Sequence, residues 1–99
     1  EWILTPPVVH NDAAVTKVVK SVTEKFATVV TPEVTLGAED FANYMEHVPG
    51  CFVFIGTGCP REWHHPAFLV DDAALPFAIQ YFVDNTNALL EGLSQKGNA

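Results

Sequence analysis

A run of five apolar residues, Cys51-Phe52-Val53-Phe54-Ile55, constrains the fold of this chain more than any other feature. A strand with one face in water alternates apolar and polar side chains, whereas this run has no polar break. We therefore predict a strand that is covered on both faces, as strands are in a parallel α/β sheet. Pro49-Gly50 before the run and Gly56 after it mark its ends.

Three helical patterns accompany this strand. Asn11 or Asp12 offers a side-chain oxygen that caps a first helix of about four turns. Its apolar positions recur at three- and four-residue steps, at Val15, Val18, Val19, Val22 and Phe26. The segment 27–35, rich in Val and Thr and broken by Pro32, predicts a short strand.

A short second helix follows Gly37, and a long last helix begins near Asp71 or Asp72. The second helix has one apolar face, formed by Phe41, Tyr44 and Met45. The last helix has a stripe that we expect to be buried, formed by Leu75, Ile79, Phe82, Leu89 and Leu93 and broadened by Val83, Ala88 and Leu90.

The predicted fold class is α/β, with the order helix, strand, helix, strand, loop and helix. Residues 1–10 form an extended lead-in, residues 11–95 the α/β segment and residues 96–99 a frayed tail. A strand covered on both faces needs sheet neighbours, yet only two or three strands are available. The sequence therefore predicts an incomplete sheet, which the chain completes by dimerising or as part of something larger.

Charge and composition exclude several classes of partner. Twelve acidic against five basic residues give a net charge of −7, which repels phosphate backbones and anionic headgroups, so we expect no nucleic acid and no membrane partner. No apolar run approaches the ~20 residues of a membrane span, and residues 1–7 have no basic start, so we expect no signal peptide. Two cysteines are few for a disulfide-dependent secreted domain, so a reduced, cytoplasmic protein is expected.

The loop after the apolar run is the first candidate site. In open α/β sheets ligands bind beyond the carboxyl ends of the strands, and this loop holds Arg61, Glu62, Trp63, His64 and His65. Neutral imidazole is a common zinc ligand. Neighbouring side chains diverge in an extended loop, so one histidine binds a metal while the other packs or donates a hydrogen bond. A pair of surface or packed histidines is the alternative.

Two further clusters carry competing interpretations. Glu39 and Asp40, at the start of the second helix, position a substrate or a histidine, or else cap the helix and compensate its dipole. Cys51, Cys59 and His64 suggest a small zinc domain, but the spacing lacks the Cys-x2–4-Cys pair of structural zinc sites. Two independent thiols are the simpler interpretation.

Four motifs occur in order along the chain and cover nearly all of it. They are Pro7-Val8-Val9 with Asn11-Asp12, Gly37-Ala38-Glu39-Asp40-Phe41, Val48 to Gly56, and His64-His65-Pro66-Ala67-Phe68 with Asp72-Ala73-Ala74-Leu75-Pro76. In this order and spacing the chain resembles the metal-dependent amidohydrolases that include hippurate hydrolase, N-acyl-L-amino-acid amidohydrolase and the plant indole-acetyl-amino-acid hydrolases.

The resemblance implies that the chain is the C-terminal part of a catalytic domain, a larger α/β/α sandwich with a mostly parallel sheet. It implies an active site with two divalent metal ions (Zn, Mn, Co or Ni) and hydrolysis of small-molecule N-acyl-amino acids, including hippurate-like amides, through a metal-activated water. The family's last metal ligand, in a His-x-Pro-x-Phe/Tyr pattern, falls on His64, while Glu39 and Asp40 fall in a supporting position.

The same resemblance implies that the other ligands and the general base lie in the rest of the catalytic domain, so that the fragment is inactive alone. An inserted lid or dimerisation domain makes a homo-oligomer of the parent an expectation too. The alternative, from the residues alone, is a free-standing acidic α/β interaction module that dimerises through its sheet.

Overall fold

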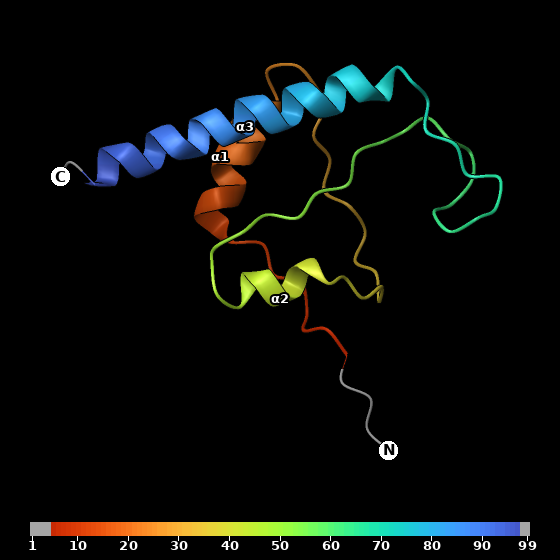
Figure 1. Cartoon of the computed structure of the whole chain (residues 1–99), viewed down its shortest axis with the longest axis horizontal. Helices are drawn as coiled ribbons and strands as arrows, with labels where there is room; N and C mark the ends of the chain where they lie inside the picture. Colours follow the sequence, from red (N-terminus) through yellow and green to blue (C-terminus); the bar gives the residue numbers. More distant parts are fainter. Residues whose placement is uncertain (1–4, 98–99) are drawn as a thin grey trace. The chain divides into compact units, whose positions relative to one another are not determined.

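The structure is a computed structural model that describes residues 5–97 (Figure 1). These residues form three helices, α1 (Ala13–Thr23), α2 (Phe41–Met45) and α3 (Ala74–Gly97). The chain divides into two compact units, the first ending at Phe52 and the second beginning at Val53. The predicted helices are confirmed as elements, and each unit is described by itself below.

Helix α1 begins where its cap was expected. The Asp12 carboxylate accepts a hydrogen bond from the Val15 N–H at 2.9 Å, which satisfies one of the N–H groups that have no partner within the helix. Val19, Val22 and Thr23 are buried. Helix α1 is therefore an amphipathic helix, as its apolar spacing predicts.

The first unit joins the start of α1 to the start of the apolar run. The Asn11 side chain donates to the Phe52 carbonyl at 2.9 Å and accepts from the Phe52 N–H at 2.8 Å. The Asp12 N–H donates to the Gly50 carbonyl at 2.9 Å. The Phe41 ring, from α2, lies 6.0 Å from the Phe52 ring, between centroids. These contacts hold residues 11, 12, 41, 50 and 52 as one cluster.

The predicted α/β fold is wrong for the residues that the structure describes, because they contain no strand. A strand needs a ladder of backbone hydrogen bonds, but both backbone polar groups of Phe52 bond to the Asn11 side chain. Segment 27–35 contains no strand either, with a bend at Ala27 and with Val34 97% exposed. The apolar and β-branched composition of the two segments led to the prediction of strands. Composition, however, does not specify which other segment a strand pairs with. Dimerisation through a sheet loses its basis here.

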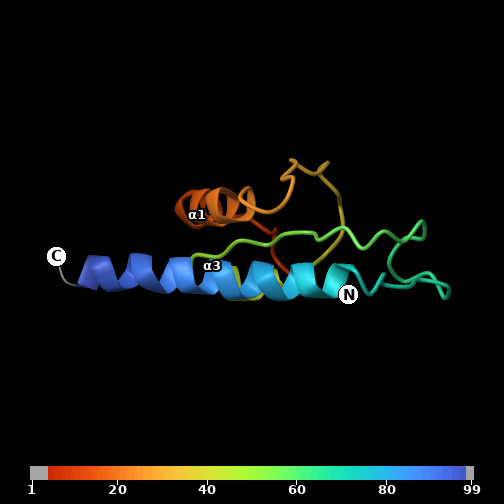
Figure 2. The same cartoon turned by 90° about the horizontal axis from the view of Figure 1, so that it is seen from above.

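Most of the apolar stripe that we expected to be buried on α3 is exposed, and its other members, Ala88 and Leu89, are half-buried. Figure 2 shows α3 as one continuous helix, and its buried residues are Tyr81 and Asn85, one turn apart, with the Asn85 Nδ2 donating to the Tyr81 carbonyl at 2.8 Å. Six members of the expected stripe are between 52% and 65% exposed, namely Leu75, Ile79, Phe82, Val83, Leu90 and Leu93. The prediction failed because α3 carries apolar or uncharged residues on two faces, and periodicity alone does not say which face is covered.

Two smaller predictions are wrong, one of them only in part. Phe54 is 53% exposed, so the apolar run is not covered on both faces. Helix α3 continues to Gly97, so the predicted tail is in part helical, while residues 98–99, like residues 1–4 of the predicted lead-in, lie outside the described residues. None of the three helices in residues 5–97 has the length and hydropathy of a membrane-spanning helix.

Candidate functional site

The loop that carries His64 is closed at its base by two hydrogen bonds. The Asp71 N–H donates to the Thr57 carbonyl at 3.2 Å, and the Leu69 N–H donates to the Cys59 Sγ at 3.5 Å. Gly58 lies between these two pairs with φ = 72°, a conformation that favours glycine. The two hydrogen bonds pair residue 57 with residue 71 and residue 59 with residue 69, so residues 59–69 form a closed loop of the second unit.

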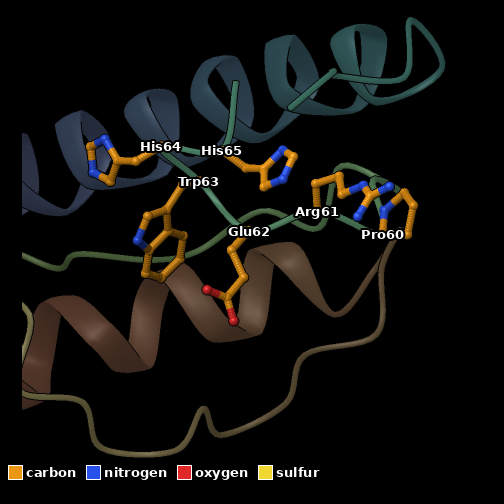
Figure 3. Close-up of a pocket in the computed structure, with 6 residues that line it drawn as sticks. All are labelled: Pro60, Arg61, Glu62, Trp63, His64 and His65. Atoms are coloured by element: carbon orange, nitrogen blue, oxygen red, sulfur yellow. The ribbon is translucent and has the colours of Figure 1, made fainter. Parts of the chain in front are cut away.

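The outer part of this loop forms an open pocket of about 380 Å³, lined by Pro60, Arg61, Glu62, Trp63, His64 and His65 (Figure 3). The Trp63 indole stacks on the Phe54 ring, with centroids 5.2 Å apart and planes 12° apart. Such aromatic pairs contribute about 0.5–1.5 kcal/mol beyond the area they bury. The stack therefore holds Trp63, the residue directly before His64, in place.

His64 has a left-handed backbone conformation, with φ = 68°. It is the one non-glycine residue with positive φ in the part of the chain that the structure describes. Histidine adopts this region more often than most residues, yet it costs roughly 1–2 kcal/mol. The imidazole rings of His64 and His65 point to opposite sides of the loop in Figure 3, which agrees with the expectation that neighbouring side chains diverge.

The two histidines differ in what their rings contact. The His65 Nδ1 accepts a hydrogen bond from the Ala67 N–H at 3.0 Å, and the His65 carbonyl accepts one from the Phe68 N–H at 2.9 Å. The neutral His65 ring therefore carries its proton on Nε2. The His64 ring is exposed and makes no hydrogen bond or ion pair to the described residues. His64 thus has a nitrogen lone pair available for a metal, whereas neutral His65 has none.

The two acidic candidates lie in the first unit. The Glu39 carboxylate accepts from the Phe41 N–H at 3.2 Å at the start of α2, so it caps that helix. Asp40 is exposed and makes no side-chain cap, and its carbonyl accepts from Asn43 at 3.0 Å through the backbone N–H and 3.1 Å through Nδ2. Glu39 has the structural role that we weighed as an alternative, and Asp40 keeps a free carboxylate within the described residues.

The two thiols have separate environments. The Cys51 Sγ accepts from the Thr16 hydroxyl at 3.6 Å in the first unit, and the Cys59 Sγ accepts from Arg61 and Leu69 N–H groups in the second. Both cysteines are free thiols. No group of three or more His, Cys, Asp or Glu side chains in residues 5–97 is arranged to hold a metal ion, so the zinc-domain hypothesis finds no site there.

Sequence reasoning identified the loop but missed what shapes it. The Phe54–Trp63 stack and the Nδ1 bond of His65 depend on contacts between residues whose spacing follows no motif. The sequence did not predict the left-handed conformation of His64, because glycine, the residue that usually indicates this conformation, is absent at that position. No sequence pattern predicted the hydrogen bonds to the Cys59 Sγ either, because a thiol is a weak acceptor whose partners follow from the fold.

Comparison with known proteins places these residues in a family. Residues 1–87 match the family described as peptidase family M20/M25/M40. The chain is 38% identical over 92 residues, 92% of its length, to N-acetyl-L-cysteine deacetylase of Bacillus subtilis, of which it covers 22%. It is 34% identical over 79 residues, 72% of its length, to IAA-amino acid hydrolase ILR1-like 6 of Arabidopsis thaliana, covering 17% of that protein.

A third relative is named for a different activity. The chain is 36% identical over 74 residues, 70% of its length, to thermostable carboxypeptidase 2 of Saccharolobus solfataricus, of which it covers 19%. It thus spans about a fifth of the length of these relatives. No solved structure matches the chain. The expected resemblance is confirmed, and the chain belongs to peptidase family M20/M25/M40, whose peptidases are generally metal-dependent.

Proposed function

We propose that this chain is the C-terminal part of the catalytic domain of a metal-dependent amidohydrolase, called the parent enzyme below, and that His64 is one of its metal ligands. The observation that carries the proposal is the match of residues 1–87 to the family, together with relatives whose names describe deacetylation or the hydrolysis of amino-acid conjugates. The reaction is cleavage of the acyl amide of an N-acyl-amino acid, with hippurate-like amides among the substrates.

The loop suits His64 to this role in three ways. Its ring is exposed, it lines the pocket of residues 60–65, and its nitrogens are not engaged by the described residues. Imidazole suits zinc, nickel and other divalent transition ions. The proposed active site holds two such ions, of Zn, Mn, Co or Ni, and His64 is a ligand of one of them. A bound ion of this kind lowers the pKa of a water and polarises the scissile carbonyl.

One imidazole is a small part of such a site. In catalytic zinc sites about three protein ligands hold the ion, and residues 5–97 present no group of that size. The remaining ligands and the general base are supplied by the rest of the catalytic domain, which makes the 99-residue chain alone inactive. Asp40 and Glu39 are the supporting acids, and Asp40 is the stronger candidate because Glu39 already caps α2.

Partners and location complete the proposal. The parent enzyme binds a small-molecule N-acyl-amino acid and no nucleic acid, in keeping with the acidic charge of the chain. It forms a homo-oligomer. We extend the proposal to a reducing compartment, the cytoplasm, because two cysteines are few for a disulfide-dependent secreted domain.

The test is hydrolysis of N-acetyl-L-cysteine and N-benzoylglycine by the purified parent enzyme before and after treatment with a chelator. We expect activity to disappear on chelation, to return with a divalent ion, and to fall by at least about a hundredfold in His64→Ala. His10→Ala, an exposed histidine in the first unit, is the matched control and keeps wild-type activity. Chelator-resistant turnover, or full activity in His64→Ala, contradicts the proposal.

A further inference from the structure

The left-handed backbone of His64 must be held, because an isolated loop relaxes out of that conformation. The stack of Trp63 on Phe54 fixes the chain directly before His64. Directly after it, the His65 N–H donates to the Glu62 carbonyl at 3.2 Å and the Phe68 N–H donates to the His65 carbonyl at 2.9 Å. These bonds form consecutive tight turns, with His64 inside the first of them.

The His65 side chain adds a bond that is specific to its ring. Its Nδ1 accepts from the N–H of Ala67, two residues further on, at 3.0 Å. This is the same reach as the side-chain oxygen of Asn or Asp in an Asx turn, because Nδ1 is attached to Cγ as Oδ1 is. The ring therefore closes the turn that leads out of His64.

The same bond removes His65 from competition for a metal. With Nδ1 accepting an N–H, the neutral ring holds its proton on Nε2, and neither nitrogen offers a lone pair. A ligand histidine needs one free nitrogen. The adjacent histidines are therefore divided by chemistry into one that is able to bind a metal and one that shapes the loop.

We propose that His65 is a positioning residue, whose Nδ1 bond to the Ala67 N–H sets where His64 presents its imidazole. The inference rests on the proposed function, in which His64 binds the metal. It assigns to His65 a role that depends on an acceptor at one place and not on an imidazole as such. A side chain that keeps that acceptor is therefore expected to replace histidine.

The experiment measures metal affinity in the parent enzyme, by competition between Co²⁺ and a chromophoric chelator. Loss of one hydrogen bond of ordinary strength predicts that His65→Ala binds Co²⁺ about three- to tenfold more weakly. His65→Asn keeps an acceptor at the same place and is expected to stay within about twofold of wild type. His64→Ala loses more than about a hundredfold, and His10→Ala, the exposed control, changes nothing.

Each outcome separates the two proposals. Unchanged affinity in His65→Ala, equal weakening in His65→Asn and His65→Ala, or a loss in His65→Ala as large as in His64→Ala overturns the positioning role. Unchanged affinity in His64→Ala overturns the ligand role instead. Should His65→Ala fail to fold, as judged by circular dichroism, His65→Gln replaces it. Its acceptor lies one bond further out, so it is expected to weaken Co²⁺ binding where His65→Asn does not, and equal binding by the two overturns the inference.

Discussion

Replacing Asn11 with alanine removes a side chain that bonds both backbone polar groups of Phe52. The two hydrogen bonds are 2.8 and 2.9 Å long, and each is worth about 0.5–1.5 kcal/mol in net stability. Both are exposed, so water replaces the lost partner and the lower half of that range applies, about 0.5–1 kcal/mol for each bond. We therefore expect Asn11→Ala to cost about 1–2 kcal/mol of local stability, which corresponds to about a five- to thirtyfold change in the opening equilibrium.

The assay is amide hydrogen exchange of the 99-residue chain by NMR, which reports local opening without requiring the two units to unfold together. The Phe52 amide is expected to exchange about five- to thirtyfold faster in Asn11→Ala, with the Val19 amide of α1 as the internal reference. Asn43→Ala is the matched control, because Asn43 is also exposed and its side chain bonds only the nearby Asp40 carbonyl, at 3.1 Å.

The result that refutes this reasoning is equally specific. If the Phe52 amide exchanges at the same rate in Asn11→Ala as in the unmodified chain, Asn11 does not hold Phe52. If Asn43→Ala accelerates it as much, the effect is not caused by the paired hydrogen bonds.

Three other substitutions test separate features of the fold and the loop. Asp12→Ala removes the cap of α1 and is expected to cost about 1 kcal/mol, seen as faster amide exchange in the first turn of α1; unchanged exchange there contradicts the cap. Gly58→Ala is expected to destabilise the loop by about 1–2 kcal/mol because φ is 72°, seen as faster amide exchange in residues 59–69. Gly56→Ala, with nothing within 4 Å of its added Cβ, is the neutral control. Equal amide exchange rates of the loop in the two variants contradict the backbone strain at Gly58. Phe54→Ala is expected to cost about 1–3 kcal/mol in chemical denaturation. This is the sum of about 0.5–1.5 kcal/mol for the stack on Trp63 and roughly half of the 1.5–3 kcal/mol of a fully buried Phe, because Phe54 is half exposed. A loss of about 3–5 kcal/mol, which a buried Phe predicts, contradicts the exposure of that ring.

Local signals in the sequence predicted the helices well. A cap residue and a helical repeat of valines are both contained in the segment they describe, so α1 and its Asp12 cap follow from neighbours in the chain. Helix α3 was also predicted, but the face it buries depends on what packs against it. Tyr81 and Asn85 are buried while the Leu and Ile stripe is exposed, and nothing in the spacing distinguishes the two.

The strands failed for a related reason. A strand is a property of two segments, and the sequence of one segment specifies only its side chains. The apolar run at 51–55 is extended, yet Phe52 bonds to a side chain and Phe54 stacks on Trp63 instead of packing between layers. The apolar composition of the run predicts that both of its faces are buried. In the structure Phe54 makes one aromatic contact, with Trp63, and is half exposed.

The sequence indicated the loop of residues 60–65 as a candidate site, and its function stays a prediction, whereas the contacts inside the loop could not be predicted. Two adjacent histidines after an apolar run indicated a ligand, and the divergence of their rings follows from chain geometry (Figure 3). Which ring is committed to a backbone N–H depends on a 3.0 Å contact with Ala67, and that contact exists only once the turn has formed. The resemblance favoured His64 by its position in a motif, and the hydrogen bonds support the same residue by a separate argument.

The central claim is that His64 supplies one ligand to a metal centre whose other ligands lie outside this chain. The most direct measurement is an anomalous difference map at the zinc absorption edge, from crystals of the zinc-loaded parent enzyme. The claim predicts a peak about 2.0–2.1 Å from a ring nitrogen of His64, with further ligands from the rest of the catalytic domain and none from His65. A metal centre that His64 does not touch, or one that His65 binds in its place, would contradict it.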